Sequence, residues 1–535
     1  IVSMSYAKEN LSEALEDIQI VLEKILTQPV TVDEIKKAIL NIASEEYYSM
    51  ETVDGLSRKV GSLEFYFKDL KAQDKFLKSA QKLTAKDIMS VVHKYLNSQT
   101  LNVSVVTNDE VKKTKEIITK WVKKHHKNLK NLKKQKIENK KIAHSKFNKT
   151  KLSSKKVQTE KLILKNGVTL LLRQHEDTHV ISAKAAYLGG IRSENQSIDG
   201  LTEVLGRTWT CGTKNRTENQ IYQEIESLAA GISPVSGRNS LGLGLDILNN
   251  FEKKGLDLFL DILTNPIFSN ETITREKQVQ LEQIKSRNDN PAQSCMRLFM
   301  DKMFADHPYS RDLLGNSDSL KKIHHEEIHD YWVKTANRKN LTLTISGNFD
   351  PNLWKNELEK RLDILPEGVR FKKIFQTKDI TEDAKIFESS AKEQSHVLYG
   401  FRGLTLNDEE RYTLQIIQSI LAGQGGRLFI ELRDKNSLAY SVSPMRMEGV
   451  DTGYFGAYIG CSPEKVQKAI KMMKEQFDKL IQERTPEIEI ERAKKYLIGR
   501  HDIDLQRTSS VASAILYNDI YDIDYNEPFT STKHY

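Results

Sequence analysis

The chain has 535 residues, of which 38% are hydrophobic and 29% are charged, and its formal net charge is +8 at pH 7. This length exceeds the roughly 250–300 residues that one hydrophobic core can organise, so several domains are predicted. No run of about 18 apolar residues occurs, so no membrane-spanning helix is predicted. The three cysteines, Cys211, Cys295 and Cys461, lie far apart and indicate neither a disulfide framework nor a thiolate zinc site.

The first region, residues 1–108, is predicted to be helical with one closing strand. Apolar residues recur at spacings of three and four on one helical face, at Leu11, Leu15, Ile18, Leu22 and Ile25. Pro29 ends this helix, and the sequence from Thr31 to Glu34 is a capping box that opens the next helix. Residues 101–106 have the rough alternation of a strand.

Positive charge is concentrated in the stretch that follows. Residues 111–157 contain 18 lysines, no arginine and two acidic residues, so they carry a formal charge of +16 and the rest of the chain carries −8. Basic blocks of this kind are usually solvated linkers or tails. We therefore interpret the stretch as a linker, with binding of nucleic acid or of an anionic membrane as the alternative.

The remaining residues show both strand and helix patterns. Asn166 and Gly167, between two apolar runs, predict a β-hairpin over residues 162–172. The other predicted elements are helices near residues 219–228, 250–264 and 408–421, and strands at residues 341–346 and 397–400.

The chain also contains an internal repeat. The sequence SYAKENLSEALEDIQIVLEKI, from Ser5, aligns with YIGCSPEKVQKAIKMMKEQFDKL, from Tyr458, so that Ile18 corresponds to Met473. TVDEIKKA, from Thr31, then aligns with TPEIEIERA. The first and last regions are therefore predicted to be copies of one unit.

A duplicated α+β unit with these phrases resembles the pitrilysin/insulinase family of metallopeptidases, which includes the mitochondrial processing peptidases. Four collinear phrases carry the resemblance: LILKNGVTLLLRQHEDTHVISAKAAYLGGIRSE, LFLDILTNPIFSNETITREKQVQLEQIKSRNDNP, HPYSRDLLGNSDSLKKI and GGRLFIELRDKNSLAYSV, beginning at Leu162, Leu258, His307 and Gly425. Together with the first region, they cover nearly everything except the basic stretch.

The resemblance implies an α+β fold of duplicated units, each an antiparallel sheet with helices packed on one face, arranged as a clamshell of two lobes. Residues 1–108 would be the C-terminal half of the first lobe, truncated at its start, and residues 109–158 the lysine-rich hinge. Residues 159–350 would be the first half of the second lobe, and residues 351–535 its second half, truncated at its end.

The family's zinc motif, HxxEH, places two histidines one helical turn apart to bind zinc, with the glutamate as general base. By the resemblance, GLTEVLGRTWTCGT, from Gly200, occupies the motif position in the second lobe. The first histidine, the glutamate, the second histidine and the downstream ligand are replaced by Glu203, Gly206, Arg207 and Gln283. A cationic arginine argues against a bound metal, so no zinc is expected on this chain, and Glu203 is expected to pair with Arg207. Zinc would belong to the full-length parent, in the part of the first lobe that precedes Ile1.

Arg433 and Tyr440 are the candidate catalytic residues. They lie in LRDKNSLAY, on a predicted loop between a helix and a strand. In the family, an arginine and a tyrosine at this spacing reach the active site of the other lobe, where they bind the substrate carbonyl and stabilise the oxyanion. A fixed cation with forked donors and a neutral phenol donor suit this role. The alternative is that both are ordinary surface residues.

The sequence from His325 to His329, HEEIH, matches the HExxH pattern of other zinc peptidases. Its flanks lack the apolar run that buries such a zinc helix, and only Glu357 or Glu359 could be proposed as a further ligand. We therefore predict a solvated amphipathic helix here.

The resemblance predicts that the parent protein is a zinc metalloendopeptidase, a hydrolase that degrades peptides or unfolded segments, and that this chain alone is inactive. A non-catalytic family member that acts as a scaffold or regulatory partner of an active subunit is the alternative. The expected partners are the peptide substrate and the missing lobe or an active subunit; no nucleic acid is expected, and a homodimer is allowed. Bacterial tandem members of this kind are often exported, which favours the periplasm.

Overall fold

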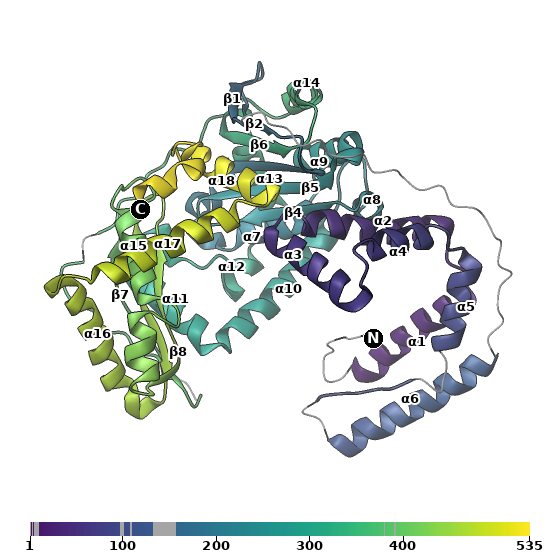
Figure 1. The fold of residues 1–535 in the computed structure, drawn as a ribbon, viewed down its shortest axis with the longest axis horizontal. Helices are drawn as coiled ribbons and strands as arrows, with labels where there is room; N and C mark the ends of the chain where they lie inside the picture. Colours follow the sequence, from purple (N-terminus) through teal and green to yellow (C-terminus); the bar gives the residue numbers. More distant parts are fainter. Residues whose placement is uncertain are drawn as a thin grey trace. The chain divides into compact units, whose positions relative to one another are not determined.

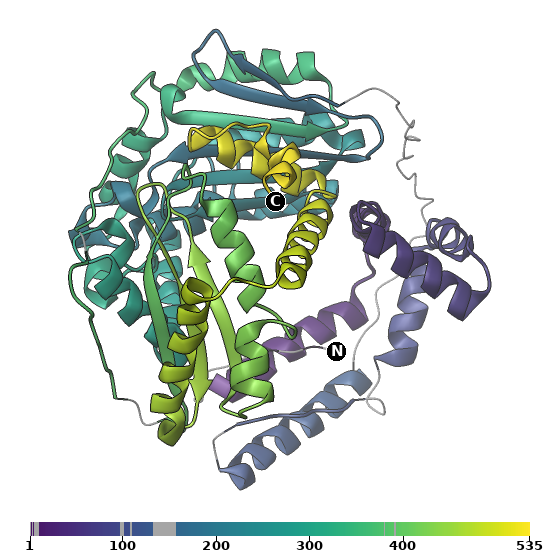
Figure 2. The same ribbon diagram turned by 60° about the vertical axis from the view of Figure 1, so that its left-hand side comes forward.

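The computed structural model describes residues 2, 4, 10–96, 101–107, 110–131, 157–378, 380–389 and 392–535. The chain divides into two compact units (Figures 1 and 2). Unit 1 comprises Ile1–Ser49 and Asp54–Phe147, and unit 2 comprises Met50–Val53 and Asn148–Tyr535. No helix in the described part of the chain is long and apolar enough to cross a membrane.

Unit 1 is built from helices. They are α1 (Leu11–Thr27), α2 (Val32–Ser49), α3 (Val53–Ser62), the π-helical turn η2 (Leu63–Phe67), α4 (Ala72–Ala80), α5 (Ala85–Tyr95) and α6 (Val111–Asn131). The capping box predicted before α2 is formed, because the Thr31 backbone N–H donates to the Glu34 carboxylate at 2.7 Å and the Glu34 N–H donates to the Thr31 hydroxyl at 3.2 Å. The first predicted helix and its successor are therefore confirmed.

The strand predicted at residues 101–106 does not form. Its residues form no ladder with another described residue, and no described residue of unit 1 lies in a strand. Leu101 and Val103 instead pack against a small cluster centred on Leu11 and Trp121, while Val106 is 99% exposed. A strand needs a neighbour for its backbone hydrogen bonds, so an alternating pattern alone does not make one.

Part of the predicted linker is a helix. Residues 111–131 form α6, whose Trp121 is buried and donates its indole N–H to the Leu15 carbonyl at 2.7 Å. An apolar stripe at helical spacing holds α6 against α1, and the abundant lysines obscure that stripe in the sequence. Residues 132–156 of the predicted linker lie outside the described residues.

Unit 2 contains a six-stranded sheet. Its strands are β1 (Glu160–Ile163), β2 (Thr169–Gln174), β3 (Val180–Leu188), β4 (Gly231–Ser236), β5 (Ser240–Leu248) and β6 (Leu341–Gly347), in the order β1-β2-β6-β3-β5-β4. Only β2 and β6 pair in parallel. The predicted hairpin is confirmed as β1 and β2, with Gly167 in its turn at φ +87°.

Helices cover both faces of this sheet. Those that lie within its own sequence region are α7 (Leu201–Trp209), α8 (Glu218–Leu228), α9 (Glu252–Thr264), α10 (Asn270–Asn288), α12 (Ser317–Lys321), α13 (His325–Thr335) and α14 (Pro351–Arg361). The core on their side of the sheet includes Trp209 and Trp332, whose ring centroids are 4.7 Å apart. The other face packs against α18 (Thr508–Ile520), through residues such as Ile515 and Leu516. The helix α11 (Pro291–Met303) belongs instead to a separate apolar cluster with Phe304 and Tyr454.

A second sheet of unit 2 repeats part of this topology. Its strands β7 (Ser395–Gly403), β8 (Ala439–Met447) and β9 (Gly453–Cys461) are all antiparallel, in the order β7-β9-β8, which matches β3-β5-β4 of the first sheet. One face is covered by helices that include α15 (Arg411–Leu421) and α16 (Val466–Gln482), and α17 (Glu487–Asp504) follows. The two sheets are therefore built on one plan.

Helix lengths agree with the internal repeat of the sequence. α1 and α16 each have 17 residues, and α2 and α17 each have 18. The shift along the chain that places α5 on α13 also places residues 101–107 on β6. Residues 101–107 of unit 1 thus correspond to a central strand of unit 2.

Candidate functional site

The helix α7, where the resemblance expects the zinc motif, is anchored at its N-terminus. The carboxylate of Glu194 accepts hydrogen bonds from the backbone N–H groups of Gly200 at 3.2 Å and Thr202 at 2.6 Å. Gly200 has φ +94°, and a Cβ there would lie 2.7 Å from the Leu314 carbonyl oxygen, so only glycine fits this cap. Burial raises the pKa of Glu194, although its contacts with Thr202 and Gly200 act in the opposite direction.

Three of the motif positions come together in space. Arg207 Nη2 lies 2.9 Å from Glu203 Oε1 and 2.6 Å from Gln283 Oε1, and the Ser236 hydroxyl, from β4, donates to the other Glu203 oxygen. The predicted Glu203–Arg207 ion pair is therefore confirmed, and Gln283 of α10 also binds the guanidinium. The sequence could not place Ser236, because it comes from a neighbouring strand.

These residues do not match the ligands that zinc prefers. Zinc sites in proteins use histidine, cysteine or carboxylate ligands, whereas Arg207 presents a cation to Glu203 and Gln283. Across the described residues, no group of three or more His, Cys, Asp or Glu side chains could hold a metal ion. The guanidinium therefore links α7 to α10 by hydrogen bonds at this position.

The HEEIH sequence lies at the start of α13. His325 donates its Nδ1 hydrogen to the Phe268 carbonyl at 2.8 Å, whereas His329 is largely exposed, 3.8 Å from Asp330. The inner face of the helix buries Tyr331 and Trp332. The predicted amphipathic helix is thus present, and the hydrogen bond of His325 holds its ring against a backbone group.

Arg433 and Tyr440 are brought together by a tight turn. Arg433 belongs to the π-helical turn η9 (Phe429–Asp434), and Tyr440 lies at the start of β8. The guanidinium carbon of Arg433 is 5.1 Å from the Tyr440 ring centroid and 4.7 Å from that of Phe429. Leu438 N–H donates to the Leu432 carbonyl at 2.9 Å and closes the turn.

The backbone of this turn exposes the tyrosine. Ser437 has φ +48°, an uncommon conformation for a residue other than glycine. The pairing of β8 with β9 shifts register between Ala439 and Ser441, and Tyr440 is 82% exposed. Such bulges re-aim a side chain next to functional sites. A phenol and a guanidinium are therefore presented side by side as hydrogen-bond donors.

Sequence reasoning missed a charged pocket of about 570 Å³ in unit 2. Its lining includes Arg287 and Arg297 of α10 and α11 and Asp301, Arg311 and Asp312. Its arginines are already paired: Arg311 with Asp199 at 2.7 Å, Arg297 with Glu388 at 3.0 Å, and Arg287 with Asp312. The sequence phrase HPYSRDLLGN contributes several lining residues and could have indicated the pocket. The ion pairs of its arginines, however, depend on the tertiary fold.

Two family models match the chain. The model described as "Insulinase (Peptidase family M16)" matches residues 170–317, and that described as "Peptidase M16 inactive domain" matches residues 322–497. Both describe parts of one family, and together they cover more than half of the chain. The chain belongs to the M16, or pitrilysin/insulinase, family of peptidases.

Similar proteins agree with this assignment. The chain is 28% identical to an uncharacterized zinc protease of Rickettsia bellii over 62% of this chain and 80% of that protein, and 28% identical to one of Rickettsia felis over 62% and 81%. Its fold is similar to an M16 inactive domain from Pseudomonas fluorescens, with 18% identity, a TM-score of 0.64, and coverage of 70% of this chain and 91% of that one. Its fold is also similar to that of a protease from Helicobacter pylori, with 19% identity, a TM-score of 0.64, and coverage of 71% of this chain and 92% of that one.

Proposed function

We propose that this chain supplies part of the substrate chamber of a zinc-dependent endopeptidase that degrades peptides or unfolded segments. Zinc and the general base would belong to a lobe with an intact HxxEH motif. Arg433 and Tyr440 would bind the substrate carbonyl and stabilise the oxyanion that forms during hydrolysis. Residues 1–108, 159–350 and 351–535 would be the half-lobes, and residues 109–158 the hinge.

The observation that supports this proposal most directly is the pairing of Arg433 with Tyr440. Tyr440 lies on the bulge of β8 and is 82% exposed, and the half-buried guanidinium of Arg433, from η9, lies against its ring. Both side chains can donate hydrogen bonds. An exposed phenol beside a guanidinium fits a role in contacting a substrate.

The second candidate function is that of a non-catalytic partner of an active peptidase subunit. Two observations favour it: residues 322–497 match a model described as an inactive domain, and Arg207, which the resemblance aligns with a zinc ligand, contacts Glu203 and Gln283. A scaffold would require neither the phenol of Tyr440 nor the guanidinium of Arg433. The two functions therefore differ in what happens when the phenol is removed.

The test measures zinc by atomic absorption and cleavage of a quenched fluorogenic peptide. The chain alone is expected to carry no stoichiometric zinc and to cleave nothing, whereas cleavage is expected when an M16 polypeptide with an intact HxxEH motif is added. Tyr440→Phe should then lower kcat roughly 100-fold, the size of effect seen when one oxyanion donor is lost.

The matched control is Tyr496→Phe, since Tyr496 is an exposed tyrosine of α17. This variant should leave kcat unchanged. Unchanged kcat in Tyr440→Phe would favour the scaffold instead. Stoichiometric zinc on the chain alone, lost in His325→Ala, would overturn the proposal.

A further inference from the structure

α6 has two faces of different chemistry. The inner face is fixed to α1 by Trp121, whose indole donates to the Leu15 carbonyl at 2.7 Å, and by His125, whose Nδ1 lies 2.7 Å from Gln19 Oε1. Both side chains are buried, and their rings stack with centroids 5.4 Å apart. The helix is therefore held in one orientation within unit 1.

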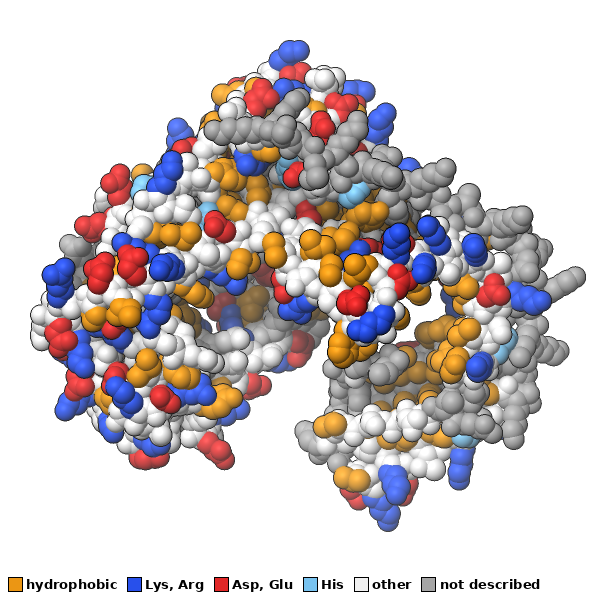
Figure 3. Space-filling model, viewed as in Figure 1, with side chains coloured by type: hydrophobic (Ala, Val, Ile, Leu, Met, Phe, Trp, Pro, Cys, Tyr) orange, Lys and Arg blue, Asp and Glu red, His pale blue; other side chains and the backbone are white. Residues whose placement is uncertain are grey.

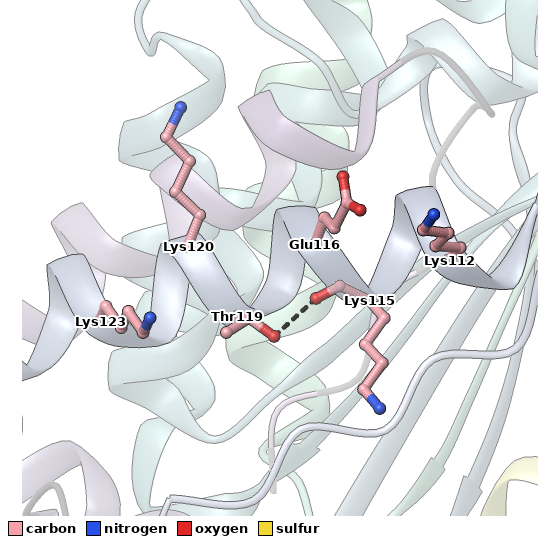
Figure 4. A pocket seen from close by; sticks show the side chains of 6 residues that line it. All are labelled: Lys112, Lys115, Glu116, Thr119, Lys120 and Lys123. Carbon is pink, nitrogen blue, oxygen red and sulfur yellow. Dashed lines mark hydrogen bonds between the residues drawn. The ribbon is translucent and has the colours of Figure 1, made fainter.

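The outer face of α6 carries lysines. An open pocket of about 430 Å³ lies on it, lined, among the described residues, by Lys112, Lys115, Glu116, Thr119, Lys120 and Lys123. Figure 4 shows the Lys115 and Lys120 side chains extending to opposite sides of the helix. We call Lys112, Lys115, Lys120 and Lys123 the lysine face.

The lysine face is not neutralised within unit 1. No described acidic side chain forms an ion pair with any of its four members. The neighbouring Lys124 forms an ion pair with Glu16, at 2.8 Å. Like charges three or four residues apart destabilise a helix. By contrast, basic and acidic side chains are interspersed on the face of unit 2 that Figure 3 shows.

We propose that the lysine face is a docking surface for an acidic segment of polypeptide. It would bind an extended chain whose carboxylates meet the four ammonium groups. From Lys112 to Lys123 the helix rises about 16 Å, which an extended peptide of about five residues would span. The choice of a polypeptide as the partner rests on the proposed peptidase function. The charge and geometry of the lysine face do not depend on that function.

The chemistry of this face favours a peptide over other polyanions. Single-stranded nucleic acid is normally held by stacking of bases on aromatic rings and by arginine. None of the described residues that line the lysine face is aromatic or an arginine, and the rings of Trp121 and His125 are buried. A membrane-binding helix needs exposed apolar residues between its cations. Between Lys112 and Lys123, the exposed residues are lysines, Glu116 and Thr119.

The experiment measures binding of a fluorescein-labelled oligoglutamate to the full chain by fluorescence anisotropy. The native chain should bind it, and more weakly as salt rises, because salt screens exposed charges. Changing the lysine face to glutamine should weaken binding about tenfold or more, since four exposed ion pairs are removed. The changes are Lys112→Gln, Lys115→Gln, Lys120→Gln and Lys123→Gln.

A control variant makes the same change in charge elsewhere in unit 1. It carries Lys71→Gln, Lys78→Gln, Lys82→Gln and Lys86→Gln, all at exposed positions in or beside α4 and α5. This control should bind nearly as well as the native chain. Circular dichroism should show that both variants keep their helix content.

Three results would overturn the proposal. They are no binding of oligoglutamate, an equal loss in both variants, and tighter binding of oligothymidine or of phosphatidylserine-phosphatidylcholine vesicles through the same four lysines. Because the assay needs no cleavage, its outcome is separate from that of the fluorogenic peptide test. Loss of cleavage with retained docking would contradict the proposed function alone.

Discussion

At the scale of single residues, Arg207 decides what the motif position can do. Its guanidinium contacts both Glu203 of its own helix and Gln283 of α10. These are the positions at which the family resemblance places two of the ligands. The side chains at the three positions therefore meet, and a guanidinium and an amide stand among them where the resemblance expects metal ligands.

This argument predicts that zinc binding can be restored. The changes are Glu203→His, Gly206→Glu, Arg207→His and Gln283→Glu. A Cβ at Gly206 would meet only Ser236, with its Cβ at 3.4 Å and Oγ at 3.5 Å, so a glutamate can be built there. The variant should bind about one zinc per chain, since it then offers a histidine and carboxylate ligand set.

Atomic absorption after dialysis is the measurement for this variant. The matched control keeps Arg207 and makes the other three changes, and it should bind no zinc because a cation remains among the ligands. A folded four-residue variant without zinc would show that the backbone positions do not converge as the motif requires.

Asp261 of α9 provides a second residue-scale prediction. Its buried carboxylate accepts hydrogen bonds from Thr213 at 2.7 Å, Asn215 at 2.6 Å and Arg216 at 2.7 Å, and so ties the loop after α7 to α9. Burial of the carboxyl raises its pKa, but these hydrogen bonds lower the pKa by more than burial raises it. The pKa of Asp261 therefore lies below the usual 3.8. Ionised Asp261 therefore stabilises the fold.

The sign of the pH dependence follows from this lowered pKa. The stabilisation is fully present above the unfolded pKa of about 3.8 and is lost as the pH falls through the lower folded value. Asp261→Asn should reduce the free energy of unfolding by about 1–3 kcal/mol at pH 7. In urea unfolding, the difference from the native chain should shrink below pH 4.

Asp257→Asn is the control, because Asp257 also pairs with Arg216 but its side chain is 52% exposed. It should change the free energy of unfolding by less than about 1 kcal/mol. A pH-independent effect of Asp261→Asn would contradict the assignment to the ionised carboxylate.

At the scale of elements, α6 shows that a lysine-rich sequence can be a packed helix. Its inner stripe alone decides the packing, and Trp121 is the largest side chain in it. The charged outer face adds no packing but is held rigidly by the inner one. The packing of α6 against α1 therefore also fixes the direction in which the lysines point.

Trp121→Ala should release α6 from α1. Removing a buried tryptophan costs about 3–5 kcal/mol, which is enough to undock a helix held by a small cluster. Hydrogen exchange measured by mass spectrometry should show faster exchange in α1 and α6, and unchanged exchange in α9 of unit 2. Trp121→Phe, which retains most of the apolar contact, should show a smaller increase.

Unaltered protection of α6 in Trp121→Ala would mean that the helix is held by other contacts. The hydrogen bonds from His125 to Gln19 and from Asn128 to Glu23, and the ion pair between Lys124 and Glu16, would then have to suffice. Polar contacts at a partly exposed interface are each worth about 1 kcal/mol, so we expect them to be insufficient.

At the scale of the whole molecule, one plan is used repeatedly. The order β3-β5-β4 recurs as β7-β9-β8, and the helix lengths of α1 and α2 recur in α16 and α17. Residues 101–107 correspond to β6, although they form no ladder with another described residue.

The sequence by itself determined the local elements of this protein. The Asn166–Gly167 hairpin, the capping box at Thr31 and the Glu203–Arg207 pair are each encoded within a few residues, because turn chemistry and helical spacing act over that range. The repeat and the family phrases added the fold class, since they compare segments without needing their contacts.

Only the tertiary structure decided which distant side chains meet. Ser236 reaches Glu203 because the order of strands places β4 next to α7, and Gln283 reaches Arg207 because α10 packs beside that helix. The stacking of Arg433 on Tyr440 depends on a bulge that no local pattern predicts. Sheet register and helix packing are properties of the whole core. Contacts between residues far apart in the chain are therefore set only when that core has formed.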